Sequence, residues 1–201
     1  MRIIHIIPSA FEYFNDIRSQ AFKLLGGLHK LGVETEAFTL QYNQPSKSMK
    51  AEVTEDSSSV HNYAGNINLD NLAEHFSGFD IAHLHCPFLG MARKIIDWKK
   101  LHPNFPLVVT YYRDVRFEDI FSIFIKLYNA YYLPKIFTLA SVVVCYNFES
   151  FRKTAGLRSL HDKSSLAILD EIELGEEGES LKPTELVAAK TLAVYNSILR
   201  A

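Results

Sequence analysis

The sequence predicts an α/β domain with a doubly wound, mostly parallel sheet. Short apolar runs alternate with longer segments of helical periodicity, and within each run the apolar residues are continuous. Alternating strands and helices are typical of a parallel sheet covered by helices. Continuous apolar character indicates strands buried on both faces. Five strands are predicted, near residues 3–7, 34–40, 80–84, 106–110 and 141–145.

The segments between these strands predict the helices. Asp16 is a candidate N-cap for a helix that runs to about His29, and Gly32 ends it. Residues 42–62 are polar and predict a long loop, in which a short edge strand near 51–53 is left open. Further helices are predicted near 69–76, 91–101, 117–137, 148–154 and 184–199.

The helix near 117–137 is unusually aromatic, with only a narrow polar stripe. A helix that is apolar almost all round is normally buried. A lipid-facing surface and a protein interface remain the alternatives.

Composition excludes some classes of function. The formal net charge is −2 over 201 residues with no clustered basic stripe, which argues against nucleic-acid binding. Cys86 and Cys145 lie in apolar surroundings and are expected to be buried free thiols. No apolar stretch reaches the roughly 18 residues of a membrane span. The chain is expected in the cytoplasm, with peripheral contact with a membrane surface left open.

The C-terminal forty residues differ from the rest. Residues 170–179 hold six acids in ten positions and are expected to form a solvated linker. The helix after Pro183 carries one apolar stripe, which requires a surface to pack on. The stripe comprises Ala188, Leu192, Tyr195 and Leu199.

Four segments in order carry a resemblance to a known family. They are the opening strand and proline-bearing loop (1–9), Phe79–Phe88 with its histidines before Pro87, Pro106–Asp114, and Ala140–Ser150. Together they resemble the N-terminal, acceptor-side domain of family-4 GT-B glycosyltransferases. The resemblance implies a Rossmann-like domain over residues 1–165.

The tail extends the resemblance. Residues 166–173 fall where the family has the strand and linker that enter its second, donor-binding domain, and 184–201 resemble its closing helix. The resemblance therefore implies that 166–183 are an acidic linker and stub of a largely deleted donor domain, and that 184–201 cross back onto the first domain.

This implies a hexosyltransferase-like acceptor half, inactive alone and paired with a separate donor-binding chain. Its acceptor would be a sugar or a lipid-linked sugar. The alternative is a non-catalytic, degenerate module that self-associates. No catalytic residue and no cofactor is assigned.

Ligands of such sheets bind beyond the carboxyl ends of the strands. The loops at 8–16, 85–90, 111–116 and 146–149 are therefore the candidate cleft. The first loop contains Asn15 and Asp16 but no glycine, which argues against a dinucleotide there. The other candidate ligands are His85, Tyr112, Arg113 and Asp114. Tyr112 stands where the family pattern has histidine, and Asp114 has helix capping as its alternative role.

His83 and His85 lie two residues apart on one predicted strand. We expect them to point to opposite faces, with His85 in the cleft or as a hydrogen-bonded core histidine. A shared metal ion is not expected, because its ligands must converge.

Overall fold

The structure is a computed structural model that describes residues 1–8, 14–41, 59–64, 69–89, 91–114, 122–146, 148–153, 160, 166–169 and 183–200. In this part of the chain, one seven-stranded sheet has the order β3-β2-β1-β4-β5-β6-β7, and every neighbouring pair is parallel. The strands are β1 (Arg2–Ile7), β2 (Glu34–Gln41), β3 (Ser59–Ala64), β4 (Ile81–Cys86), β5 (Leu107–Tyr111), β6 (Val142–Cys145) and β7 (Leu166–Ile168). The predicted doubly wound parallel sheet is confirmed.

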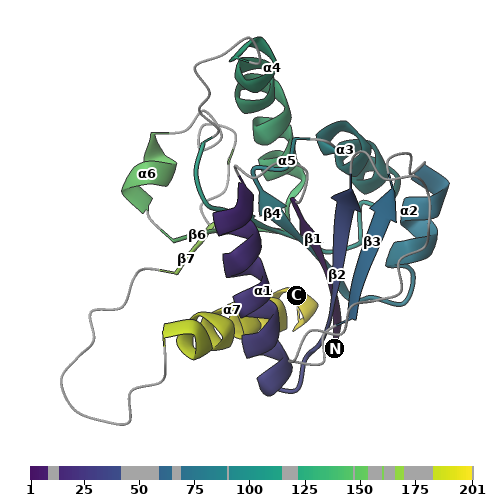
Figure 1. The fold of residues 1–201 in the computed structure, drawn as a ribbon, viewed down its shortest axis with the longest axis vertical. Coiled ribbons are helices and arrows are strands. Elements are labelled where there is room, and N and C mark those ends of the chain that lie inside the picture. Colours follow the sequence, from purple (N-terminus) through teal and green to yellow (C-terminus); the bar gives the residue numbers. More distant parts are fainter. Residues whose placement is uncertain are drawn as a thin grey trace.

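Helices cover both faces of the sheet (Figure 1). They are α1 (Asn15–Lys30), α2 (Leu69–Phe76), α3 (Ala92–Leu101), α4 (Ser122–Leu127), the π-helical turn η2 (Tyr128–Tyr132), α5 (Leu133–Leu139), α6 (Phe148–Arg152) and α7 (Pro183–Arg200). Residues from α2, α3 and α5 pack with the sheet in one core, and α1 and α7 share a second core with the opposite face. Among the helices described, none is long and apolar enough to cross a membrane.

Two elements differ from the sequence prediction. Part of the predicted loop, from Ser59 onward, is the edge strand β3. Its sequence mixes polar and apolar residues without a regular pattern and therefore gives little local signal for a strand. Its parallel pairing with β2 supplies the backbone hydrogen bonds. Residues 51–53 lie outside the described part. The aromatic helix is described from Ser122 to Leu139, so the first residues of the predicted helix, 117–121, also lie outside it.

The aromatic helix changes geometry in its middle. Pro134 has no N–H to donate and its ring conflicts with the carbonyl of the preceding turn. The chain forms a π turn there, and Leu133 N–H donates to the Tyr128 carbonyl five residues back. One side of this helix is buried, at Ile125, Tyr128 and Phe137. The expectation of burial is thus met on one side only.

Helix α7 packs back on the N-terminal domain, as predicted, and its contact is with α1. Ala188 and Tyr195 are fully buried and Leu192 is partly buried. A Cβ placed on Gly27 would lie 2.8 Å from Ala188 Cβ, so the glycine permits the close approach of the two helices. The prediction that Leu199 is buried is wrong, since it is 46% exposed. Figure 1 shows α7 crossing α1, and Leu199 lies in the last turn of α7.

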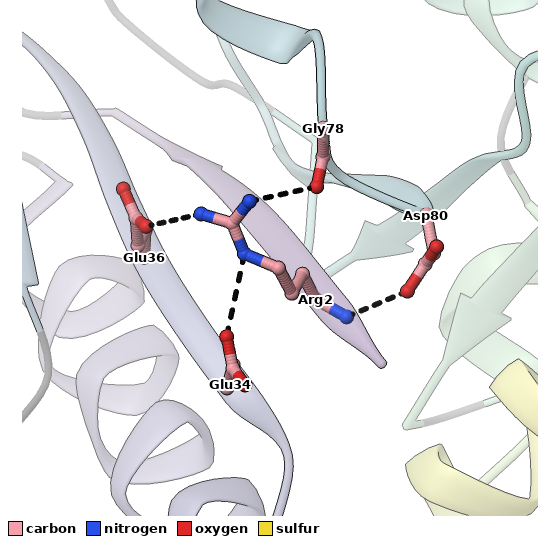
Figure 2. A network of polar contacts seen from close by, with 5 residues as sticks. All are labelled: Arg2, Glu34, Glu36, Gly78 and Asp80. Carbon is pink, nitrogen blue, oxygen red and sulfur yellow. Dashed lines mark hydrogen bonds and ion pairs between the residues drawn. The ribbon is translucent and has the colours of Figure 1, made fainter.

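The amino ends of the strands are joined by a charged network around Arg2 (Figure 2). Its guanidinium contacts Glu34 at 3.3 Å and Glu36 at 3.2 Å, and donates to the Gly78 carbonyl at 2.9 Å. Its backbone N–H donates to the Asp80 carboxylate at 2.7 Å. The network ties β1 to β2 and to the turn before β4, at the end of the sheet opposite the predicted cleft.

Candidate functional site

A pocket of about 380 Å³ lies beyond the ends of β5 and β6. The beginnings of α1 and α7 form its other walls. The residues that give it polar character are Asp16, Gln20, Lys23, Tyr112, Arg113, Tyr146 and Thr184. Its position matches the rule that parallel sheets bind ligands at the carboxyl ends of their strands.

An ion pair forms one wall of the pocket. Arg113 Nη2 lies 3.0 Å from Asp16 Oδ1, and both side chains remain partly exposed. The pair joins the first turn of α1 to the segment after β5, so it fixes a cation and an anion side by side at the rim. Two predicted cleft residues are thereby brought into one pocket.

Two tyrosines form the inner wall. The rings of Tyr112 and Tyr146 are 5.5 Å apart. Burial raises the pKa of Tyr112 well above its ordinary value and raises the pKa of Tyr146 to about 12. Both therefore stay neutral phenols at physiological pH, and can donate or accept hydrogen bonds toward a ligand.

The other predicted residues have different surroundings. His85 is fully buried behind the wall, and its Nδ1 lies 2.9 Å from the Tyr112 hydroxyl. Asp114 accepts a hydrogen bond of 2.9 Å from Tyr111, and neither it nor the exposed Asn15 lines the pocket. Whether Asp114 caps a helix involves residues 115–121, which lie outside the described part.

The expected separation of His83 and His85 is wrong. Side chains alternate along a strand, so residues two apart share a face. The two rings stack with centroids 4.5 Å apart. The β1–β4 register places His5 beside His83, and a nitrogen of each of the three rings lies within 4.8 Å of the others. The geometric reason for excluding a shared metal ion therefore does not hold.

Hydrogen bonds link this histidine cluster (His5, His83 and His85) to both the pocket wall and α7. His5 Nδ1 lies 3.0 Å from His85 Nε2, which connects the cluster to Tyr112. His83 Nε2 lies 2.7 Å from Thr110 Oγ1, and its Nδ1 contacts the Tyr195 hydroxyl. The network thus runs from the pocket wall into the buried α7 contact.

All three rings are fully buried. Burial lowers the pKa of His85 to about 3, and burial together with the neighbouring His85 lowers the pKa of His5 and His83 well below the usual value. At neutral pH the rings are uncharged, so each offers one N–H and one lone pair.

Sequence reasoning missed Gln20, Lys23, Tyr146 and Thr184 in the pocket, and His5 and Tyr195 in the network. Tyr195 was predicted only as an apolar contact, although its hydroxyl bonds His83. The sequence did contain a signal for His83 and His85, because residues two apart on a strand lie on the same face. No local pattern relates Thr184 to Asp16, since α7 reaches the pocket only through the tertiary fold.

No protein-family model matches this sequence, and no curated protein matches it. Solved structures do match. A sucrose-phosphate synthase from Thermosynechococcus elongatus, whose name carries the spans 27–220 and 406–426, has a TM-score of 0.58 at 12% identity over 99% of both chains.

Two structures of an alpha-glucosyltransferase also match. One, in complex with UDP, has a TM-score of 0.51 at 13% identity over 90% of this chain. The other, with UDP and a 13-mer DNA, has a TM-score of 0.53 at 12% identity over 85% of this chain. The present chain spans only 42% and 41% of those chains. At these identities the matches show the fold: a Rossmann-like α/β domain like that of GT-B glycosyltransferases.

Proposed function

We propose that this chain is the acceptor-side half of a glycosyltransferase and that a separate polypeptide supplies the donor-sugar half. The observation that carries the proposal is the docking of α7 on α1 beside a complete parallel sheet. In the family that the sequence resembles, the closing helix follows the second, donor-binding domain and crosses back onto the first domain. Helix α7 packs on α1 as such a closing helix would.

The match to the sucrose-phosphate synthase supports this division. That chain is named by a long first span and a short second span, with a gap between them, and it matches end to end. We propose the corresponding limits here: a glycosyltransferase-like domain over 1–165, a linker and stub over 166–183, and a crossover helix over 184–201.

The pocket chemistry suits a sugar acceptor. Ligand pockets typically enclose roughly 300–1,000 Å³, and about 380 Å³ is available here. Asp16 and Arg113 can bind sugar hydroxyls, and the Tyr112 and Tyr146 rings offer apolar surface with neutral hydroxyls. Lys23 adds a second cation, which favours an acceptor that bears phosphate, as a lipid-linked sugar does.

The first test measures binding to the pocket with defined probes. Saturation-transfer NMR with glucose, N-acetylglucosamine and glucose 1-phosphate should show contact with the chain, strongest for the phosphate. Arg113→Ala and Tyr146→Ala should remove that contact, and Lys30→Ala, an exposed charge at the far end of α1, should not. Equal signals in all three variants would reject the pocket as the acceptor site.

The second test concerns catalysis. The purified chain alone should transfer no sugar and bind no UDP- or GDP-sugar in calorimetry, because the domain that grips the nucleotide is a separate chain. Positioning and electrostatic stabilisation of the leaving diphosphate would then be incomplete. Micromolar nucleotide-sugar binding that is lost in Asn15→Ala or Asp114→Ala would mean that one domain holds a complete site.

The alternative is a non-catalytic, degenerate module that self-associates or lies on a membrane surface. One observation favours it: Ile123, Leu127 and Tyr131 are exposed four residues apart on the α4–η2 surface, and Arg93, Lys100 and Lys135 line a hollow with Tyr131. Light scattering and sedimentation with anionic vesicles test it. Self-association or vesicle binding that is lost in Ile123→Ser/Leu127→Ser would support the alternative, provided that no sugar binds the pocket.

A further inference from the structure

We propose that His5, His83 and His85 form a buried site for one divalent transition-metal ion, with Zn²⁺ the best fit, that fastens β1 to β4 at the centre of the sheet. The proposal concerns the fold and is independent of the proposed sugar chemistry. It rests on the convergence of three imidazoles from paired strands on one face of the sheet.

The first step is the geometry. In the parallel register His5 lies beside His83, and His85 follows two residues later on the same face. One nitrogen from each ring lies within 4.8 Å of one from each other ring. Zinc–nitrogen bonds of about 2.0–2.1 Å in tetrahedral geometry place ligand atoms roughly 3.3–3.4 Å apart. Small ring movements would satisfy that spacing.

The second step is the set of groups behind the rings. A metal-bound histidine usually donates its other N–H to an oxygen, which fixes the ring orientation. His83 Nε2 has Thr110 Oγ1 at 2.7 Å and His85 Nδ1 has the Tyr112 hydroxyl at 2.9 Å. Each of these two histidines therefore has an oxygen acceptor at one nitrogen. At the other nitrogen a metal ion would replace a hydrogen bond, that of His83 Nδ1 to the Tyr195 hydroxyl and that of His85 Nε2 to His5.

The third step is an unsatisfied atom. His5 Nε2 is buried and has no hydrogen-bond partner among the described residues. If His5 donates from Nδ1 to His85, its Nε2 carries a buried, unused lone pair. If it accepts there, Nε2 carries a buried, unused N–H. The hydrogen bonds of the metal-free cluster thus leave one polar atom unpaired in either tautomer, which is uncommon in protein interiors.

The donor type selects the ion. Neutral imidazole suits Zn²⁺, Cu²⁺, Ni²⁺ and Co²⁺, whereas Mg²⁺ and Ca²⁺ require oxygen ligands. The Tyr195 oxygen, which contacts His83, is the nearest additional donor.

The experiment uses the full chain purified without a polyhistidine tag. Elemental analysis after growth in zinc-supplemented medium should give about one zinc per chain, and Co²⁺ added to chelator-treated protein should give the visible absorption of tetrahedral cobalt. His5→Gln should abolish both. His29→Gln, at an exposed position on α1, should change neither.

A milder variant covers the case in which His5→Gln fails to fold. Thr110→Val keeps the three rings but removes the oxygen behind His83, and should weaken Co²⁺ binding by about 10- to 100-fold. Wild-type protein that binds less than about one-tenth equivalent of zinc and cobalt would overturn the proposal. Equal affinity in wild type and Thr110→Val would overturn it too, and metal lost in His29→Gln would mark it as surface binding.

Discussion

The sheet carries two polar clusters, one charged and partly exposed, the other uncharged and fully buried. The Arg2 network makes four contacts at the amino ends of the strands, and its charged side chains stay partly exposed to water. The Arg2 side chain is 44% exposed. The histidine cluster holds β1, β4 and α7 together with uncharged rings that are fully buried. The first cluster gains little because water screens it. The second is costly to disturb, because a lost partner leaves a buried group unpaired.

The largest expected effect comes from removing α7, since this opens the buried cluster to water. A chain that ends at residue 182 loses the burial of Tyr195, Ala188 and part of Leu192. Truncating a single buried aromatic residue costs about 3–5 kcal/mol, so the total loss should exceed about 5 kcal/mol. Urea unfolding checks it, with Leu199→Ser as a control that should leave stability unchanged. An unaltered midpoint in the shortened chain would show that α7 is not part of the fold.

Lowering the pH should remove the stabilisation from the histidine cluster and leave that from the Arg2 network unchanged. The unfolded rings titrate near 6.5, whereas burial keeps the folded pKa of His85 at about 3 and those of His5 and His83 well below the usual value. Below pH 6.5 the rings of the unfolded chain take up protons and those of the folded chain do not. The free energy of unfolding therefore falls with pH, by up to about 1.4 kcal/mol per pH unit for each ring, and this loss is absent well above pH 6.5.

Urea unfolding between pH 7.5 and 5, with a chelator present to exclude metal release, measures this loss. Arg2→Ala should show the same acid dependence as the wild type, because the network around Arg2 contains no histidine. A flat profile down to pH 5 would mean that the rings are accessible to water in the folded chain.

Features that depend on a local sequence pattern could be predicted, whereas those that depend on contacts between distant residues could not. Each central strand is predictable because an apolar run such as Ile3–Ile7 reports burial on both faces without further context. The fold class follows from the order of such runs. Asp16, Tyr112 and Arg113 were found because the ends of parallel strands meet at one edge.

The histidine cluster needed relations that no local pattern contains. That His83 and His85 share a face follows from strand parity, which the prediction applied wrongly. That His5 joins them depends on β1 pairing with β4, across a separation of 78 residues in the register. Tyr195 and Thr184 come from a helix whose docking site is fixed by the tight contact between Gly27 and Ala188.

A smaller effect isolates one buried hydrogen bond. Tyr195→Phe keeps the ring in place but leaves His83 Nδ1 without the hydroxyl that it contacts. An unpaired buried polar group costs about 1–3 kcal/mol. Tyr131→Phe is the matched control, because that hydroxyl accepts from Lys135 at the surface, and its stability should not change. Equal losses in the two variants would contradict the distinction between buried and exposed partners.

The helix crossing beside the cluster can be tested by a double-mutant cycle. Gly27→Ala places a Cβ where Ala188 Cβ would lie only 2.8 Å away, so α7 must shift despite the better helix propensity of alanine. Ala188→Gly removes the obstacle. The pair should show a favourable coupling of at least about 0.5 kcal/mol in urea unfolding, as residues in contact do. Additive effects would mean that α1 and α7 adjust freely.

The smallest effect should come from Arg2→Ala, although it removes more polar contacts than any single substitution above. Its partners Glu34 and Glu36 have side-chain exposures of 74% and 26%, and exposed ion pairs are worth about 0.2–1 kcal/mol. The backbone N–H of residue 2 can still donate to Asp80, because alanine keeps it. The loss should shrink further in 1 M salt, where the screening length falls to about 3 Å. Urea unfolding at 0.05 M and 1 M salt measures both numbers. A loss as large as that of Tyr195→Phe, unchanged by salt, would show that the guanidinium acts by covering Phe79, over whose ring it lies at 4.8 Å, and not by charge.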